Sequence, residues 1–218
     1  MIKIETIGYS PCSSYLIHNE EKGYLVDCPI KGDLDSFLRF RDIELQGIIL
    51  THGHADHLAN IHEIKKEYGI PVIAHKGDKI LALSLPVQYQ FVFGGYGPEM
   101  SSQPLSIDRH VEDGDILTLG TDTIEVIHTP GHTPGCIMLL IPSCNSLMSG
   151  DTIFDENIGR TDFPLSDKED FLVSINEKVL PLDDSLKVYS GHDSSLNGYF
   201  ILGDWKRWWN DSKHLLGF

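Results

Sequence analysis

Short apolar runs separated by turn residues predict strands and helices in alternation along the chain. The predicted strands of the first half are 2–7, 14–18, 23–27, 47–50 and 72–74, and the predicted helices are 33–41, 57–68 and 76–83. The polar stretch 19–22 lies between two of these strands and is typical of a hairpin turn. Gly69, with Pro71 beyond it, indicates the end of the second helix, and Asp33 is placed to cap the first.

The second half repeats this pattern after a break. Its predicted strands are 116–119, 123–128, 136–141, 146–149 and 186–189, and its predicted helices are 167–180 and the C-terminal helix 196–218. Trp205, Trp208 and Trp209 form a stripe on the last helix, suited to core packing or to a dimer surface. Residues 84–108, rich in Gly, Pro and aromatic residues, predict a long loop insertion that either serves as a binding loop or is pinned to the body.

Two runs of strands, each followed by helices, indicate two sheets packed face to face with helices outside them. The expected fold class is therefore α/β, in its α+β form. A chain of 218 residues can bury one sizeable core, so we expect residues 1–218 to form a single domain.

Composition narrows the class of partner. The chain has 17 basic and 32 acidic residues, and its net charge of −15 repels phosphate backbones and anionic lipids. We therefore expect neither nucleic acid nor membrane as a partner. The chain start lacks a secretion signal, and no apolar run approaches the length of a membrane span. The four cysteines form no C-x-x-C pair. We therefore expect free thiols in a cytoplasmic protein.

The densest chemistry lies in the stretch Thr-His-Gly-His-Ala-Asp-His, which directly follows predicted strand 47–50. Its four metal-ligand side chains are those of His52, His54, Asp56 and His57. A loop between a strand and a helix leaves the backbone free to aim several side chains at one point. Imidazole nitrogen and carboxylate oxygen together suit zinc, and they also suit iron or manganese.

Three further polar clusters each follow an apolar strand. They are Gly131-His132-Thr133-Pro134-Gly135, Gly150-Asp151-Thr152 and Gly191-His192-Asp193. Each is weak alone, but together with the first loop they offer seven candidate ligands, namely five histidines together with Asp56 and Asp151. Seven ligands exceed one tetrahedral site and fit two divalent metal ions that share a carboxylate. Two such ions can bridge one water and lower its pKa toward neutrality, which makes hydroxide available for hydrolysis.

The ordered set T-H-G-H-A-D-H, G-H-T-P-G, G-D-T-I-F and G-H resembles the metallo-β-lactamase superfamily over nearly the whole chain. Residues 150–164 resemble its glyoxalase II-like branch, the hydroxyacylglutathione hydrolases. The resemblance implies the metallo-β-lactamase fold, a four-layer αββα sandwich with a dinuclear site at one edge. It also implies a hydrolase in which a metal-bridging hydroxide attacks a thioester carbonyl, with zinc as the expected metal.

The same resemblance assigns individual roles. Metal one would be bound by His52, His54 and His132, metal two by Asp56, His57 and His192, and Asp151 would bridge the two ions. Asp56 would also act as a catalytic residue that orients the hydroxide or relays its proton. Arg160 would bind a carboxylate of the substrate, and an ion pair with Asp162 is the alternative role for this side chain.

Two other activities remain open, and so does the identity of the substrate. A persulfide dioxygenase of the same branch would hold one iron with His52, His132 and Asp151, while a lactonase would share all seven ligands. An aspartate at position 151 weighs against β-lactamase activity. Only about 26 residues follow His192, too few for the C-terminal domain that supplies glutathione contacts in full-length glyoxalase II. We therefore expect a small thioester or other ester-like substrate without fixing its thiol carrier, and a monomer or homodimer.

Overall fold

The computed structural model describes residues 1–218 except 10–11, 30, 59, 85–87, 89–103 and 193–197. One six-stranded sheet has the order β1-β2-β3-β4-β5-β6, with β1 Lys3–Gly8, β2 Ser14–His18, β3 Lys22–Val26, β4 Glu44–Ile49, β5 Val72–His75 and β6 Arg109–Val111. The other has the order β14-β13-β10-β9-β8-β7, with β7 Ile116–Leu119, β8 Asp122–His128, β9 Ile137–Ile141, β10 Ser146–Gly150, β13 Lys187–Ser190 and β14 Phe200–Ile201. The strands β11 Ile153–Phe154 and β12 Asn157–Ile158 form a small hairpin.

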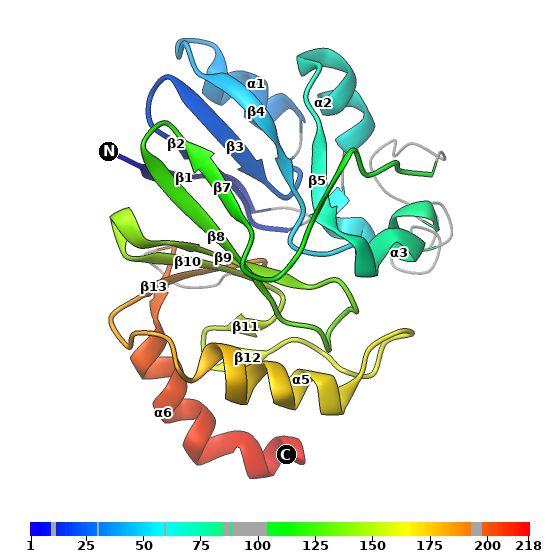
Figure 1. The fold of residues 1–218 in the computed structure, drawn as a ribbon, viewed down its shortest axis with the longest axis vertical. Coiled ribbons are helices and arrows are strands. Elements are labelled where there is room, and N and C mark those ends of the chain that lie inside the picture. Colours follow the sequence, from blue (N-terminus) through cyan, green and yellow to red (C-terminus); the bar gives the residue numbers. More distant parts are fainter. Residues whose placement is uncertain (10–11, 30, 59, 85–87, 89–103, 193–197) are drawn as a thin grey trace.

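Helices cover the outer faces of both sheets (Figure 1). The first sheet is covered by α1 Lys31–Leu38, α2 Ile61–Tyr68 and α3 Lys79–Leu83, and the second by α5 Lys168–Ser174 and α6 Leu202–Ser212. The layers therefore run helix, sheet, sheet, helix. This confirms the expected α/β class and the αββα sandwich.

Alternation along each strand builds three cores from the same sheets. Ile48 packs toward α1 and α2, while the next residue, Ile49, packs between the two sheets. In the second sheet Leu139 faces the first sheet, while Met138 packs toward α5 and α6. A strand with period-two side chains that is covered on both faces is apolar throughout, which is why these runs read as continuous hydrophobic segments in the sequence.

Strand direction decides where the polar loops meet. In the second sheet β8 is antiparallel to β9, β9 is antiparallel to β10, and β10 is parallel to β13, so β8, β10 and β13 all run the same way. Their carboxyl ends therefore lie at one edge of that sheet. The amide of Ile137 donates to the carbonyl of Thr51 over 2.8 Å, which joins this edge to the loop that follows β4 of the first sheet.

Several predicted elements need correction. The helix expected at 57–68 is interrupted, because a short 3-10 helix, Ala55–Leu58, precedes α2, and Asn60 between them has a left-handed φ of 55°. Gly69 ends α2 with φ 64°, as predicted. Asp33 does not cap α1 but lies in its first turn. Most of the loop expected at 84–108 lies outside the described residues.

The elements near the C-terminus also differ from the prediction. The segment expected as a helix over 196–218 contains the short strand β14, then α6, then a 3-10 helix Lys213–Leu216. The helix expected over 167–180 is α5 followed by a π-helical turn, Ile175–Val179. Trp205 and Trp209 are fully buried and stack on each other, which supports the core-packing role of the aromatic stripe. None of the helices in the described part of the chain combines the length and hydropathy that a membrane span needs.

Replacing Trp205 with Ala should lower the free energy of unfolding by about 3–5 kcal/mol, because it empties a core position beneath α6. The change also removes the indole N–H that donates to the carbonyl of Asn157 in the β11–β12 hairpin. Urea denaturation measures this loss. Arg207→Ala, on the exposed face of the same helix, is the control and should change the free energy of unfolding by less than about 0.5 kcal/mol.

Candidate metal centre

The loops after β4, β8, β10 and β13 bring all seven predicted ligands to one edge of the sandwich. Their ligand atoms form three groups, each within 4.8 Å, namely His52 with His54 and His132, His52 with His57 and Asp151, and Asp56 with His57 and His192. The residues come from both sheets and are separated by up to 140 positions in the chain (from 52 to 192). Only the tertiary fold can produce this arrangement.

Asp151 lies at the centre of the cluster. Its Oδ1 atom is 3.3 Å from Nε2 of His57. Its Oδ2 atom is 3.5 Å from Nε2 of His132, 3.5 Å from Nε2 of His192 and 3.9 Å from Nε2 of His52. One carboxylate therefore faces histidines of both predicted metal sites, with Oδ2 near histidines of each and Oδ1 near His57.

Two buried polar atoms of this cluster indicate that a cation fits there. Nε2 of His132 and Oδ1 of Asp151 are buried and make no hydrogen bond within the described residues. Buried polar atoms are normally paired, since leaving one unpaired costs about 1–3 kcal/mol. A divalent cation would satisfy the imidazole lone pair and the carboxylate oxygen together, so the residues present fit a metal ion.

Two neighbouring acceptors fix the orientation of the imidazole rings. Nδ1–H of His57 donates to the Asp27 carboxylate over 2.8 Å, and Nδ1–H of His132 donates to the carbonyl oxygen of Arg160 over 2.8 Å. With the proton held at Nδ1, the lone pair of each ring is at Nε2 and points into the cluster. Asp27 is itself held by the amide and hydroxyl of Thr51, each at 2.8 Å.

The local electrostatics divide the histidines into two sets and keep Asp151 ionised. Burial alone would lower the pKa of His57, but nearby anionic groups, Asp151 and Asp27 among them, outweigh it and raise that pKa, and the hydrogen bond to Asp56 raises the pKa of His192. Burial, with help from neighbouring imidazoles, places the pKa of His52 well below its ordinary value and lowers the pKa of His54 to about 4. Burial alone would raise the pKa of Asp151, but the imidazoles around it outweigh that effect and hold its pKa below the ordinary value. At neutral pH the side of His52 and His54 thus offers imidazole lone pairs beside an anionic carboxylate, the forms that bind divalent cations, while a cation bound by His57 and His192 would replace protons there.

Glycines give the ligands room. A Cβ atom on Gly191 would lie 2.2 Å from Oδ1 of Asp151 and 2.6 Å from Cε1 of His57. A Cβ atom on Gly159 would lie 1.9 Å from the carbonyl oxygen of Asp151. Close packing around the cluster therefore requires glycine at positions 191 and 159.

Aromatic side chains line two sides of the cluster. The ring of Phe163 lies 5.4 Å from that of His54 and 5.9 Å from that of His132, while the ring of Phe154 lies 6.1 Å from that of His192. Both phenylalanines follow Asp151 in the chain, so one segment supplies a ligand and an apolar wall.

Arg160 is engaged by the second of its two predicted partners. Its Nε and Nη2 atoms each donate to Asp162 over 2.8 Å, and its guanidinium carbon lies 4.1 Å from the centre of the Phe163 ring. The ion pair predicted as the alternative role is therefore present. A contact with a substrate carboxylate stays a prediction.

Two residues of the site were not singled out from the sequence. Asp27, which orients His57, follows the apolar strand β3 in the same way as Asp151 follows β10, so the signal was available. Phe163 carried no such signal, because its approach to His54 depends on how the segment after β12 folds back.

Replacing Gly191 with Ala should weaken zinc binding by about tenfold or more, since the new methyl group displaces Asp151 or His57. Titration of the metal-free protein with Zn²⁺ against a chromophoric chelator measures the change. Gly32→Ala is the matched control, because a Cβ at Gly32, within α1, meets nothing within 4 Å. Equal zinc affinity in both variants would contradict the packing argument.

Comparisons with known proteins agree with this geometry. Residues 7–192 match a family model described as "Metallo-beta-lactamase superfamily". Hydroxyacylglutathione hydrolase GloC of Haemophilus influenzae is 36% identical over 167 residues, which cover 76% of this chain and 75% of GloC.

Two solved structures are similar over almost their full length. BLEG-1, a B3 metallo-beta-lactamase, matches with a TM-score of 0.78 and 28% identity, covering 94% of this chain and 95% of its own. TTHA1623, in a di-iron-bound form, matches with a TM-score of 0.80 and 26% identity, covering 94% of this chain and 97% of its own. The chain therefore belongs to the metallo-β-lactamase superfamily, within its glyoxalase II-like branch.

Proposed function

We propose that this protein is a metal-dependent hydrolase that cleaves a thioester of the hydroxyacylglutathione type. The observation that carries the proposal is the pair of three-ligand groups on either side of Asp151, which matches the requirement of a dinuclear hydrolytic site. The similarity to GloC, whose name is hydroxyacylglutathione hydrolase, supports the substrate class.

The ligand assignment follows the grouping of the side chains. His52, His54 and His132 would hold one ion, Asp56, His57 and His192 the other, and Asp151 both. Divalent ions bound there would acidify water and polarise the carbonyl of the substrate. Zinc suits this set of nitrogen and oxygen donors, while the di-iron form of TTHA1623 supports iron as the alternative.

The surrounding residues would position the reactants. Asp56, with 20% of its side chain exposed, is the more accessible carboxylate of the cluster and could accept a hydrogen bond from an attacking water. Phe163 and Phe154 would exclude bulk water from the sides that they cover. The two bonds between Arg160 and Asp162 use two of five guanidinium N–H groups, so the remaining donors can meet a carboxylate of the substrate.

One observation favours a second activity. The set of His52, His132 and Asp151, two histidines and one carboxylate, also converges, with 3.9 Å and 3.5 Å from the two Nε2 atoms to Oδ2 of Asp151. Such a facial set holds iron in oxygen-using enzymes. A persulfide dioxygenase is therefore the alternative that the experiment must separate.

Elemental analysis of protein purified without chelators, together with two assays, makes this separation. Two metal ions per chain and hydrolysis of S-lactoylglutathione are the expected results. One iron per chain, with oxygen consumption on glutathione persulfide and no thioester hydrolysis, would overturn the proposal in favour of the alternative.

Asp151→Ala should lower metal content and turnover together, turnover by on the order of 100-fold or more, because even residues that merely orient ligands account for about 10–100-fold. Metal analysis and thioester turnover on the same preparation measure both effects. Asp204→Ala, which removes an exposed carboxylate from α6, should change neither. Unchanged turnover in Asp151→Ala would contradict the central position of this carboxylate.

Arg160→Ala should raise KM for a glutathione thioester by about tenfold with a smaller effect on kcat, as expected when a charge-assisted hydrogen bond to the bound substrate is lost. Arg207→Ala is the control for loss of an exposed arginine. An unchanged KM would mean that Arg160 serves only its ion pair with Asp162.

A further inference from the structure

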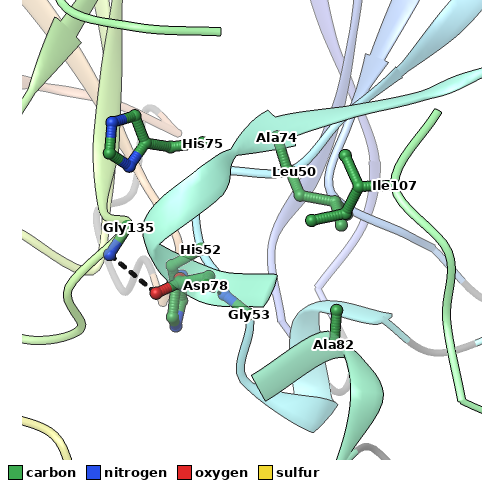
Figure 2. A pocket seen from close by; sticks show the side chains of 9 residues that line it. All are labelled: Leu50, His52, Gly53, Ala74, His75, Asp78, Ala82, Ile107 and Gly135. Carbon is green, nitrogen blue, oxygen red and sulfur yellow. Dashed lines mark hydrogen bonds between the residues drawn. The ribbon is translucent and has the colours of Figure 1, made fainter. Parts of the chain in front are cut away.

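Asp78 is a buried carboxylate that the proposed chemistry leaves unused. It lies at the end of a 3-10 helix, Lys76–Asp78, between β5 and α3, and only 2% of it is exposed. Figure 2 shows it in a closely packed pocket whose lining includes the apolar side chains of Leu50, Ala74, Ala82 and Ile107 and the rings of His52 and His75. A carboxylate in such surroundings is costly unless both of its oxygens are hydrogen-bonded.

Three donors satisfy this carboxylate, and all three come from the loops that carry histidines. Oδ2 of Asp78 accepts from the amide of Gly53 over 2.7 Å and from the hydroxyl of Thr133 over 2.7 Å. Oδ1 accepts from the amide of Gly135 over 2.6 Å, the bond drawn in Figure 2. Gly53 is 25 residues from Asp78 in the chain and Gly135 is 57 residues away, so this one side chain joins two distant loops.

The positions of the donors relate Asp78 to one of the two metal groups. Gly53 lies between His52 and His54 in the sequence, and Thr133 follows His132 directly. These three histidines are the group assigned above to metal one. Asp78 thus holds the backbone of the two loops that carry these three histidines. Neither of its oxygens belongs to the ligand groups found among the described residues.

Close packing around Asp78 explains glycines in both loops. A Cβ on Gly53 would lie 2.7 Å from Cβ of Leu81 and 3.0 Å from Cβ of Asp78, and a Cβ on Gly135 would lie 2.6 Å from Cγ of Asp78. The middle glycine of H-G-H and the last glycine of G-H-T-P-G therefore let the two loops approach the same carboxylate. The local sequence of both loops is fitted to this contact.

We propose that Asp78 is a positioning residue that sets the spacing between the His52–His54 loop and the His132 loop, and so tunes affinity for metal one but not for metal two. The proposal rests on the ligand assignment of the proposed function. Charge-assisted bonds from amides to a carboxylate are short and directional, which suits a link that must hold two loops at fixed separation. Outer partners of metal ligands typically contribute about 10–100-fold in metal affinity.

The test measures Zn²⁺ affinity of the full chain by competition with a chromophoric chelator in two backgrounds. His192→Ala removes a ligand of metal two only, and His54→Ala removes a ligand of metal one only. Adding Asp78→Asn should weaken zinc binding about 10–100-fold in the His192→Ala background and by less than about threefold in the His54→Ala background. Equal losses in the two backgrounds, or no loss in either, would overturn the proposal.

Asp108→Asn is the matched control. Asp108 also accepts from a backbone amide, that of Val72, but it pairs with Lys65 away from the cluster, so zinc affinity should not change. Thr133→Val removes one of the three donors to Asp78 and tests the same link if Asp78→Asn does not fold. Thr133→Val should lower the zinc affinity of the metal-one site by a smaller factor than Asp78→Asn. An unchanged zinc affinity in a folded Thr133→Val protein would overturn the proposal.

Because zinc binding is measured without substrate, failure of this proposal and failure of the proposed function are distinguishable. A protein that binds zinc but hydrolyses no thioester would refute the proposed function, while the comparison of the two backgrounds would still decide the role of Asp78.

Discussion

The carboxylate of Asp151 lies within 3.9 Å of an imidazole nitrogen from each of four histidines, and the rest of the molecule is arranged to hold that cluster. Five imidazoles and two carboxylates in a largely buried site are unfavourable unless positive charge is shared among them. Divalent cations meet this requirement, because they bind the lone pairs that burial keeps unprotonated on His52 and His54 and offset the charge of Asp151. The unpaired buried atoms of His132 and Asp151 and the family membership of the chain both favour bound cations.

The sandwich supplies this cluster through strand direction and double-sided burial. The strands β8, β10 and β13 end at one edge of the second sheet, and the loop after β4 of the first sheet is hydrogen-bonded to that edge through Thr51 and Ile137. The strands are buried on both faces, and glycines in the loops that follow them allow the close packing that brings the ligands together. Asp27, Arg160 through its carbonyl, and Asp78 then hold the loops or rings from outside the cluster.

The sequence was most informative where a polar residue breaks a strong apolar run. His132, Asp151 and His192 each follow such a run, so their convergence could be predicted once strand ends were expected to share an edge. The apolar periodicity did not predict the break between the 3-10 helix Ala55–Leu58 and α2. This break places Asp56 and His57 in a tighter turn than a continuous α-helix has. The contacts of Asp78 had no local signal, because they depend on two loops that lie 25 and 57 residues away.

The central claim is that the seven side chains hold two cations across Asp151. Diffraction from a crystal of the protein as purified, recorded on both sides of the zinc and iron absorption edges, tests this claim most directly. The account predicts two anomalous peaks, one bounded by His52, His54 and His132 and the other by Asp56, His57 and His192, with Asp151 between them. Side chains splayed apart around a site without any anomalous peak, even after growth with Zn²⁺ or Fe²⁺, would contradict it.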